Sequence, residues 1–154
     1  MTATARPMNG DEYIESLRDG RTVYFHGEKV RDVTTHPAFR NSVRSIARMY
    51  DALHDPQHAD ALTCETDTGS GGRTHKYFRV PRSADDLVAS RDAIVAWQRL
   101  VYGWMGRSPD YKASFLATLG AVPDFFGDYK DNALHWYAKA QEEVTYWNLS
   151  LIHI

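Results

Sequence analysis

Residues Ser83–Tyr111, SADDLVASRDAIVAWQRLVYGWMGRSPDY, contain the strongest helix signal in the chain and also its clearest helix break. Ser83 is a good helix cap, and Asp86 three residues later resembles the second half of a capping box. Apolar residues then recur at intervals that place them on one helix face, which predicts burial of that face. They are Leu87, Ile94, Trp97, Val101 and Trp104. Core packing explains this stripe better than cofactor binding does.

The helix break follows at Gly103 and Gly106, and a new helix is expected to open at Ser108. Serine caps a helix, Pro109 suits the first turn, and Asp110 suits the positive end of the helix dipole. The new helix is expected to run to the glycine at position 120.

Helical signals continue on both sides of this stretch. A short helix is expected over Glu12–Arg18, capped by Asn9 or Asp11. A second is expected to open at Thr35 or His36, with an apolar stripe that continues until Pro56 ends it. The last is expected to begin near position 128, and its predicted face is Ala133, Trp136 or Tyr137, Ala140, Val144 and Trp147.

Two segments read as β structure. Thr22–Phe25 and Lys29–Val33 flank a tight turn and predict a hairpin. The glycine-rich loop Asp67–Gly72 is followed by Thr74–Val80, which is expected to be extended. The fold class predicted from these residues is therefore mainly α with short β-hairpins.

The composition is that of an ordinary globular chain of 154 residues, with 43% hydrophobic and 25% charged residues. Its net charge of −2 disfavours a dedicated nucleic-acid binder, which is usually basic. The single cysteine, Cys64, excludes an internal disulfide and any multi-cysteine metal site, and we interpret it as structural. No apolar run approaches the roughly 20 residues of a membrane helix, and residues 1–10 do not resemble a signal peptide. We expect a cytoplasmic protein that binds neither membrane nor nucleic acid.

The segment Arg107-Ser108-Pro109-Asp110-Tyr111 is the strongest candidate site. A helix N-terminus has unpaired amides and partial positive charge, so it favours an anion. Arg107 adds a fixed charge with a planar fork, and Tyr111 adds a hydroxyl one turn later. Together they could hold a phenol oxygen and favour its phenolate. The alternative is that Arg107 pairs with Asp110 and that Tyr111 is only packed.

Other motifs carry weaker signals. The glycine run 69–72 with Arg73 could cradle a phosphate, but it matches no known phosphate loop and a flexible hairpin loop is the better interpretation. His54 and His58 have the spacing of metal ligands, but Pro56 breaks the helix that they would share, and no metal is expected. A basic face, formed by Arg40, Arg44 and Arg48, could contact phosphates of DNA or a nucleotide, but a solvated face or pairing with another subunit is the better interpretation.

The chain resembles the N-terminal domain of the 4-hydroxyphenylacetate 3-hydroxylase oxygenase family. Four stretches carry the resemblance, in the family's order, and together they span the chain from Asn9 to Asn148. They are GDEYIESLRDG (10–20), DVTTHPAFRN (32–41), TDTGSGG with THK (66–72 and 74–76) and YGWMGRSPDY (102–111).

The resemblance implies an acyl-CoA-dehydrogenase-like flavoprotein, of which this chain holds the N-terminal helical domain and lacks the β-barrel and the C-terminal helical bundle. The family enzyme is the oxygenase of a two-component system: a separate flavin reductase supplies FADH2, and the oxygenase uses O2 to hydroxylate a phenol such as 4-hydroxyphenylacetate, giving a catechol. The resemblance assigns contacts with the phenolic oxygen to Arg107 and Tyr111, while Ser108, Pro109 and Asp110 line the same segment. It also implies a homo-oligomer at full length.

One departure concerns the last residues. The family has a substrate-contacting His directly after the Asn that matches Asn148, but Leu149 stands here. Residues 149–154, LSLIHI, match the translation of CTG TCT CTT ATA CAC ATC, a transposase adapter used in sequencing libraries. We expect residues 1–148 to be the native domain and 149–154 to be adapter read-through, with a natural apolar tail as the alternative. We also expect that the chain is inactive alone and that most flavin contacts lie downstream.

Three alternatives stay open. The parent could hydroxylate another phenol, such as a chlorophenol, because Arg107 and Tyr111 would read only the hydroxyl group. It could be a lyase related to 4-hydroxybutyryl-CoA dehydratase, but that enzyme needs an iron–sulfur cluster with several cysteine ligands, and this chain has only Cys64. It could also be a catalytically silent interaction module.

Overall fold

The computed structural model describes residues 6–103 and 110–143, which form helices and two short hairpins. The helices are α1 (Gly10–Ser16), α2 (Arg40–Ala52), α3 (Ala59–Leu62), α4 (Ala84–Leu100), α5 (Asp110–Ala121) and α6 (Lys130–Glu143), with the 3₁₀ segments η1 (Lys76–Phe78) and η2 (Pro123–Tyr129). The antiparallel strand pairs are β1 (Val23–Phe25) with β2 (Glu28–Val30), and β3 (Thr63–Glu65) with β4 (Arg73–His75). This confirms the predicted fold class.

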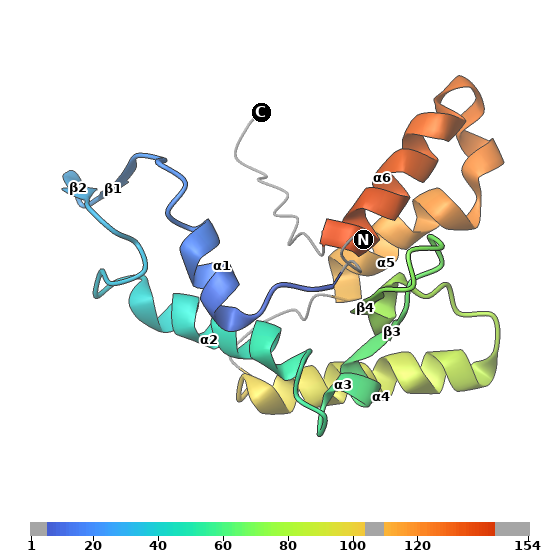
Figure 1. The fold of residues 1–154 in the computed structure, drawn as a ribbon, viewed down its shortest axis with the longest axis horizontal. Helices are drawn as coiled ribbons and strands as arrows, with labels where there is room; N and C mark the ends of the chain where they lie inside the picture. Colours follow the sequence, from blue (N-terminus) through green and yellow to red (C-terminus); the bar gives the residue numbers. More distant parts are fainter. Residues whose placement is uncertain (1–5, 104–109, 144–154) are drawn as a thin grey trace.

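The helices form two groups joined by α4. Figure 1 shows α1 beside α2 at one end of the molecule and α5 beside α6 at the other, with the long helix α4 running below α2 and α3. The β3–β4 hairpin lies between α4 and the α5–α6 pair, and β4 contacts α6. Within the two described ranges, no helix combines the length and the apolar character that crossing a membrane requires.

A capping box starts α1. The Asn9 side chain accepts a hydrogen bond from the Glu12 amide at 2.9 Å, and the Glu12 carboxylate accepts one from the Asn9 amide at 2.8 Å. The Arg6 guanidinium also pairs with Glu12 at 2.6 Å, and these contacts lower the pKa of Glu12 to about 2. The predicted Asn9 cap is confirmed, and the helix begins at Gly10 because the cap stands directly before it.

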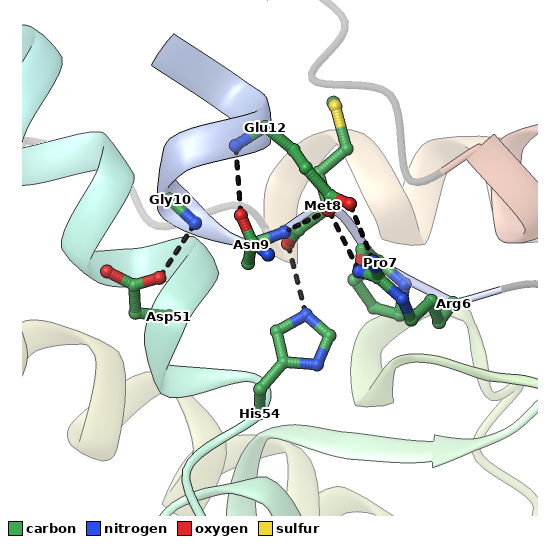
Figure 2. Close-up of polar contacts among 8 residues, drawn as sticks. All are labelled: Arg6, Pro7, Met8, Asn9, Gly10, Glu12, Asp51 and His54. Carbon is green, nitrogen blue, oxygen red and sulfur yellow. Dashed lines mark hydrogen bonds and ion pairs between the residues drawn. The ribbon is translucent and has the colours of Figure 1, made fainter. Parts of the chain in front are cut away.

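The start of α1 is fastened to α2, as Figure 2 shows. The Gly10 amide donates to the Asp51 carboxylate at 2.7 Å, and a His54 ring nitrogen lies 3.2 Å from the Met8 carbonyl. A Cβ at Gly10 would stand 2.6 Å from Asp51 Oδ2 and 2.8 Å from the Ala47 carbonyl. Glycine therefore lets the two helices approach closely here.

Several predicted boundaries were wrong. The first helix spans Gly10–Ser16 rather than Glu12–Arg18, and α5 continues through Gly120 to Ala121, where Gly120 makes room for the Tyr137 ring instead of ending the helix. The second helix starts at Arg40 rather than at Thr35 or His36, because the preceding residues form a separate turn in which the His36 ring accepts the Ala38 amide at 3.2 Å. The extended segment expected over Thr74–Val80 stops at His75, where η1 begins. This turn buries Tyr77 and Phe78 together, which an alternating strand would not do.

The core forms where α2, α4, η1 and the α5–α6 pair meet. Trp97 is fully buried at its centre, which confirms the core interpretation of the α4 stripe, and Trp104 lies outside the described residues. Leu87 was wrongly assigned to that buried face: it is 60% exposed, because the first turns of α4 extend past the elements that cover the rest of the helix. The other members of the core cluster are Met49, Tyr50, Ala52, Leu53, Leu62, Tyr77, Phe78, Ala93, Val101, Ala113, Leu116 and Ala140.

His75 is a buried histidine of this core. Only 3% of it is exposed, and its ring lies 5.3 Å from the Trp97 ring and 6.4 Å from that of Tyr77, centroid to centroid. Burial disfavours the charged imidazolium and lowers the pKa of His75 from 6.5 to about 4.

The buried histidine predicts an acid-sensitive fold. Between about pH 6.5 and pH 4 the unfolded chain binds a proton at His75 that the folded chain does not, so the free energy of unfolding should fall as the pH falls. We expect a loss on the order of 2 kcal/mol between pH 7 and pH 4.5, measured by urea denaturation. A His75→Gln variant should lose most of this slope, and an unchanged slope in that variant would contradict the assignment.

Candidate functional site

The candidate segment leads into α5, at the end of the α5–α6 pair where α6 finishes and which faces the middle of the molecule in Figure 1. α5 and α6 are joined by the short η2 segment and lie side by side in Figure 1, so the first turn of α5 and the last turn of α6 share one end of the pair. Asp110 is the first residue of α5 and is half-buried, and Tyr111 is 52% exposed. Arg107, Ser108 and Pro109 lie outside the described residues.

The chain approaches this segment through a left-handed turn at the end of α4. Tyr102 has a φ of 55° and Gly103 a φ of 70°, and the Gly103 amide donates to the Gln98 carbonyl at 2.9 Å. A non-glycine residue in the left-handed region is strained, and Tyr102 keeps that conformation with the Arg48 guanidinium 6.0 Å from its ring centroid. The prediction that Gly103 ends the helix is confirmed, while Gly106 lies outside the described residues.

A hydrogen-bonded cluster that we did not predict joins the β3–β4 loop to α6. The Asp67 carboxylate accepts from the Tyr137 hydroxyl at 2.5 Å and from the Gln141 side-chain amide at 2.7 Å. Tyr137 and Gln141 are 8% and 2% exposed, whereas the backbone of Asp67 lies in an exposed loop. One signal was available: Gln141 is a polar residue four positions after Tyr137, on the face that the apolar spacing of α6 predicts to be buried.

The burial of Tyr137 depends on Gly120 in α5. A Cβ at Gly120 would stand 2.4 Å from the Tyr137 ring, so the ring occupies the space that a side chain would need. Burial, together with the hydrogen bond to the Asp67 carboxylate, raises the pKa of Tyr137. The phenol therefore stays protonated and acts as a hydrogen-bond donor.

The glycine-rich loop does not form a phosphate cradle. The Thr66 amide donates across the loop to the Gly72 carbonyl at 3.0 Å, and the Ser70 hydroxyl accepts the Gly72 amide at 3.1 Å. The Arg73 side chain lies away from the loop, donating to the Thr63 hydroxyl at 2.9 Å. The predicted hairpin loop is confirmed, and its polar groups are used to hold its own shape.

The remaining motifs of the sequence serve local structure. A ring nitrogen of His54 lies 3.2 Å from the Met8 carbonyl oxygen, and a ring nitrogen of His58 lies 3.9 Å from the Asp55 carboxylate. The two histidines therefore face separate partners on either side of the break at Pro56. Burial raises the pKa of the Cys64 thiol, which makes it a poor nucleophile. The basic face of α2 is solvent-exposed, as predicted; its members are Arg40, Arg44 and Arg48.

Comparison with known proteins identifies the same family over nearly the whole chain. A family model described as 4-hydroxyphenylacetate 3-hydroxylase N terminal matches residues 9–154. The oxygenase component of a 4-nitrophenol 2-monooxygenase from a Rhodococcus species is 70% identical over 148 residues, 96% of this chain. The oxygenase component of 4-hydroxyphenylacetate 3-monooxygenase from Escherichia coli is 56% identical over 98% of this chain.

A solved structure agrees with these matches. The crystal structure of a 4-hydroxyphenylacetate 3-monooxygenase oxygenase component, complexed with FAD and 4-hydroxyphenylacetate, superposes with a TM-score of 0.76 and 37% identity over 87% of this chain. The chain spans 28% of that structure's length, and 28% and 29% of the two relatives. It therefore corresponds to the N-terminal part of these longer proteins.

The left-handed turn before the candidate segment gives a stability prediction. A Gly103→Ala change places a Cβ at a φ of 70°, and it should lower the free energy of unfolding by about 1 kcal/mol. Ser114→Ala, at an exposed position in α5, is the control and should change it by less than about 0.5 kcal/mol. The free energy of unfolding of the unchanged chain and of both variants is measured by chemical denaturation. Equal denaturation midpoints for Gly103→Ala and the unchanged chain would contradict the left-handed conformation assigned to Gly103.

Proposed function

The chain belongs to the 4-hydroxyphenylacetate 3-hydroxylase family, and on this premise we propose that its parent protein hydroxylates a para-substituted phenol ortho to the hydroxyl group, using FADH2 and O2. The observation that carries the proposal is the segment Arg107–Tyr111, which leads into α5 at the end where α6 also finishes. That the relatives are monooxygenase oxygenase components supports the same assignment for the parent of this chain.

The proposed role of the segment is to bind the phenol through its oxygen. Arg107 and Tyr111 contact that oxygen, and Ser108, Pro109 and Asp110 line the same part of the site. A guanidinium and a phenol hydroxyl stabilise negative charge on the substrate oxygen by attraction and hydrogen bonding. Phenolate character makes the ring carbon ortho to the oxygen more reactive toward an electrophilic oxygen donor. The exposed Tyr111 side chain is accessible for such a contact.

The described residues do not by themselves fit a flavin. The one glycine-rich loop closes on itself, and Arg73 beside it is bonded to Thr63, so neither provides a cradle for the flavin phosphates. We therefore assign no flavin contact to the described residues, 6–103 and 110–143. The proposal places the flavin contacts in the part of the parent that follows this domain.

We propose that residues 1–148 are the native domain and that residues 149–154 are adapter read-through. The chain as written then lacks the substrate-contacting histidine that follows the equivalent of Asn148 in the family, and it should be inactive alone. The parent is proposed to be a cytoplasmic homo-oligomer that receives FADH2 from a separate reductase and needs no metal.

Two substrates are candidates, because the relatives named above act on different phenols. The name of the 70% identical relative favours 4-nitrophenol, and that of the 56% identical relative favours 4-hydroxyphenylacetate. Both carry the hydroxyl group that Arg107 and Tyr111 would contact, and a chlorophenol carries it as well. The lyase alternative is disfavoured because the relatives that are 70% and 56% identical are named as monooxygenase components.

The proposal is tested on the full-length protein, obtained by reading the source gene through codon 148. With a flavin reductase, NADH and O2, it should convert 4-nitrophenol or 4-hydroxyphenylacetate to the corresponding catechol, detected by chromatography. A protein that binds flavin but hydroxylates neither phenol contradicts the substrate class. If the full-length protein binds no flavin, the result favours the alternative of a catalytically silent interaction module.

The role of Arg107 gives a sharper prediction. In the full-length protein, Arg107→Ala should raise the KM for the phenol roughly 10-fold or more, since losing a hydrogen bond to a charged group costs about 1.5–3 kcal/mol. Hydrogen peroxide should also replace part of the catechol. Arg91→Ala removes an exposed arginine of α4 that pairs with the adjacent Asp92 and is the matched control. If Arg107→Ala has an unchanged KM for the phenol and releases no additional hydrogen peroxide, Arg107 does not have the assigned role.

A further inference from the structure

The helix α4 lies along the lower edge of the molecule in Figure 1, and its face away from the core carries an exposed apolar row. Val88 and Val95 are 44% and 40% exposed, and Tyr102, two residues after the helix, is 84% exposed. Their spacing of seven residues is two helical turns, so the two valines lie nearly on one line along the helix. The opposite face buries Ala93 and Trp97 in the core. A helix that is apolar on two opposite faces is typical of one that is covered on both.

A charged row with the same spacing runs beside the apolar one. Asp85, Asp92 and Arg99 are exposed and also stand seven residues apart, so the row is acidic at the start of α4 and basic at its end. The Arg91 guanidinium donates to Asp92 at 3.0 and 2.8 Å, and both bonds end on Oδ1. They leave Oδ2 of Asp92 open to a further donor.

We propose that this face of α4 binds the same face of a second copy of the chain, with the two helices antiparallel and a twofold axis at Val95. In this register the two Val95 side chains meet, and Val88 of each copy faces Tyr102 of the other. Asp92 stands level with position 98 of the other copy, which is about 1.5 Å along the helix from Arg99. Two Asp92–Arg99 pairs therefore form, one on each side of the axis.

The charges favour this arrangement over a parallel one. A parallel pair in register would place Asp92 against Asp92 and Arg99 against Arg99, and it would align the two helix dipoles, so both terms would be repulsive. The antiparallel pair makes both terms attractive. The interface is therefore selected by charge as well as by apolar area.

The symmetry of the pattern favours a second copy as the occupant. An isologous contact uses one surface twice, so that surface must complement itself. The row does so about Val95, because an apolar residue stands seven positions away on each side, an acid three positions before and a base four positions after. The other candidate occupant is the part of the parent that follows this domain, and such a partner would not require this symmetry.

The test is disulfide crosslinking in the full-length protein. Val95→Cys places one thiol of each copy at the twofold axis, within the distance that a disulfide spans. Mild oxidation should give a product of twice the subunit mass, in which mass spectrometry finds the residue-95 peptide joined to itself. Leu87→Cys is the matched control, because Leu87 is 60% exposed on the same helix but points about 100° around it from Val88. It should crosslink no more than the unchanged protein does.

Charge variants of the Val95→Cys protein test the register. Arg99→Glu turns both Asp92–Arg99 pairs into like-charged pairs and should slow crosslinking roughly fivefold or more. Adding Asp92→Lys reverses the other member of each pair and should restore the rate. Arg44→Glu, at an exposed position of α2, is the control and should change the rate by less than about twofold.

Two results would overturn the proposal. If no disulfide joins residue 95 to itself, α4 does not bind a second copy; a thiol that also resists alkylation would show that the rest of the same chain covers this face. If the disulfide forms but Asp92→Lys fails to restore the rate lost in Arg99→Glu, the antiparallel register is wrong. Neither readout depends on hydroxylation, so the outcome is independent of the proposed function.

Discussion

The close packing of α5 against α6 is the constraint on which the rest of the account depends. It needs a glycine at position 120, where a Cβ would stand 2.4 Å from the Tyr137 ring of α6, and both helices bury alanines in the core, among them Ala113 and Ala140. Gly120 also makes the space that the Tyr137 ring fills, and the ring brings its hydroxyl to Asp67. Because the pair is antiparallel, the start of α5 and the last turn of α6 lie at the same end of the pair. That end of the pair is where we propose that the phenol binds.

Regular helices were predictable from the sequence because apolar spacing and capping residues act locally. The Asn9 cap, the Ser83 cap and the burial of Trp97 all follow from such signals, and the structure confirms them. The burial predicted for Leu87 was wrong, because periodicity identifies a face without saying how far its covering elements extend. The prediction of an extended segment after His75 was also wrong, because the chain must turn there to bury the two consecutive aromatic side chains of Tyr77 and Phe78.

The helix that follows the candidate segment was predictable, because its start pattern lies in adjacent residues, and α5 begins at Asp110. The substrate contacts assigned to Arg107 and Tyr111 stay a prediction. The Asp67 cluster could not be predicted, because its members are separated by 70 and 74 positions and meet only after the hairpin packs on α6. The composition of the glycine run 69–72, which follows Asp67, is compatible with a phosphate-binding loop. Its hydrogen bonds instead stabilise the loop that presents the carboxylate.

The measurement that tests this account most directly is a crystal structure of the full-length protein with FAD and 4-nitrophenol bound. The account predicts that the phenol oxygen lies within hydrogen-bond distance of the Arg107 guanidinium and the Tyr111 hydroxyl, at the end shared by α5 and α6. A phenol seated away from that end, with Arg107 paired to Asp110 instead, would contradict it.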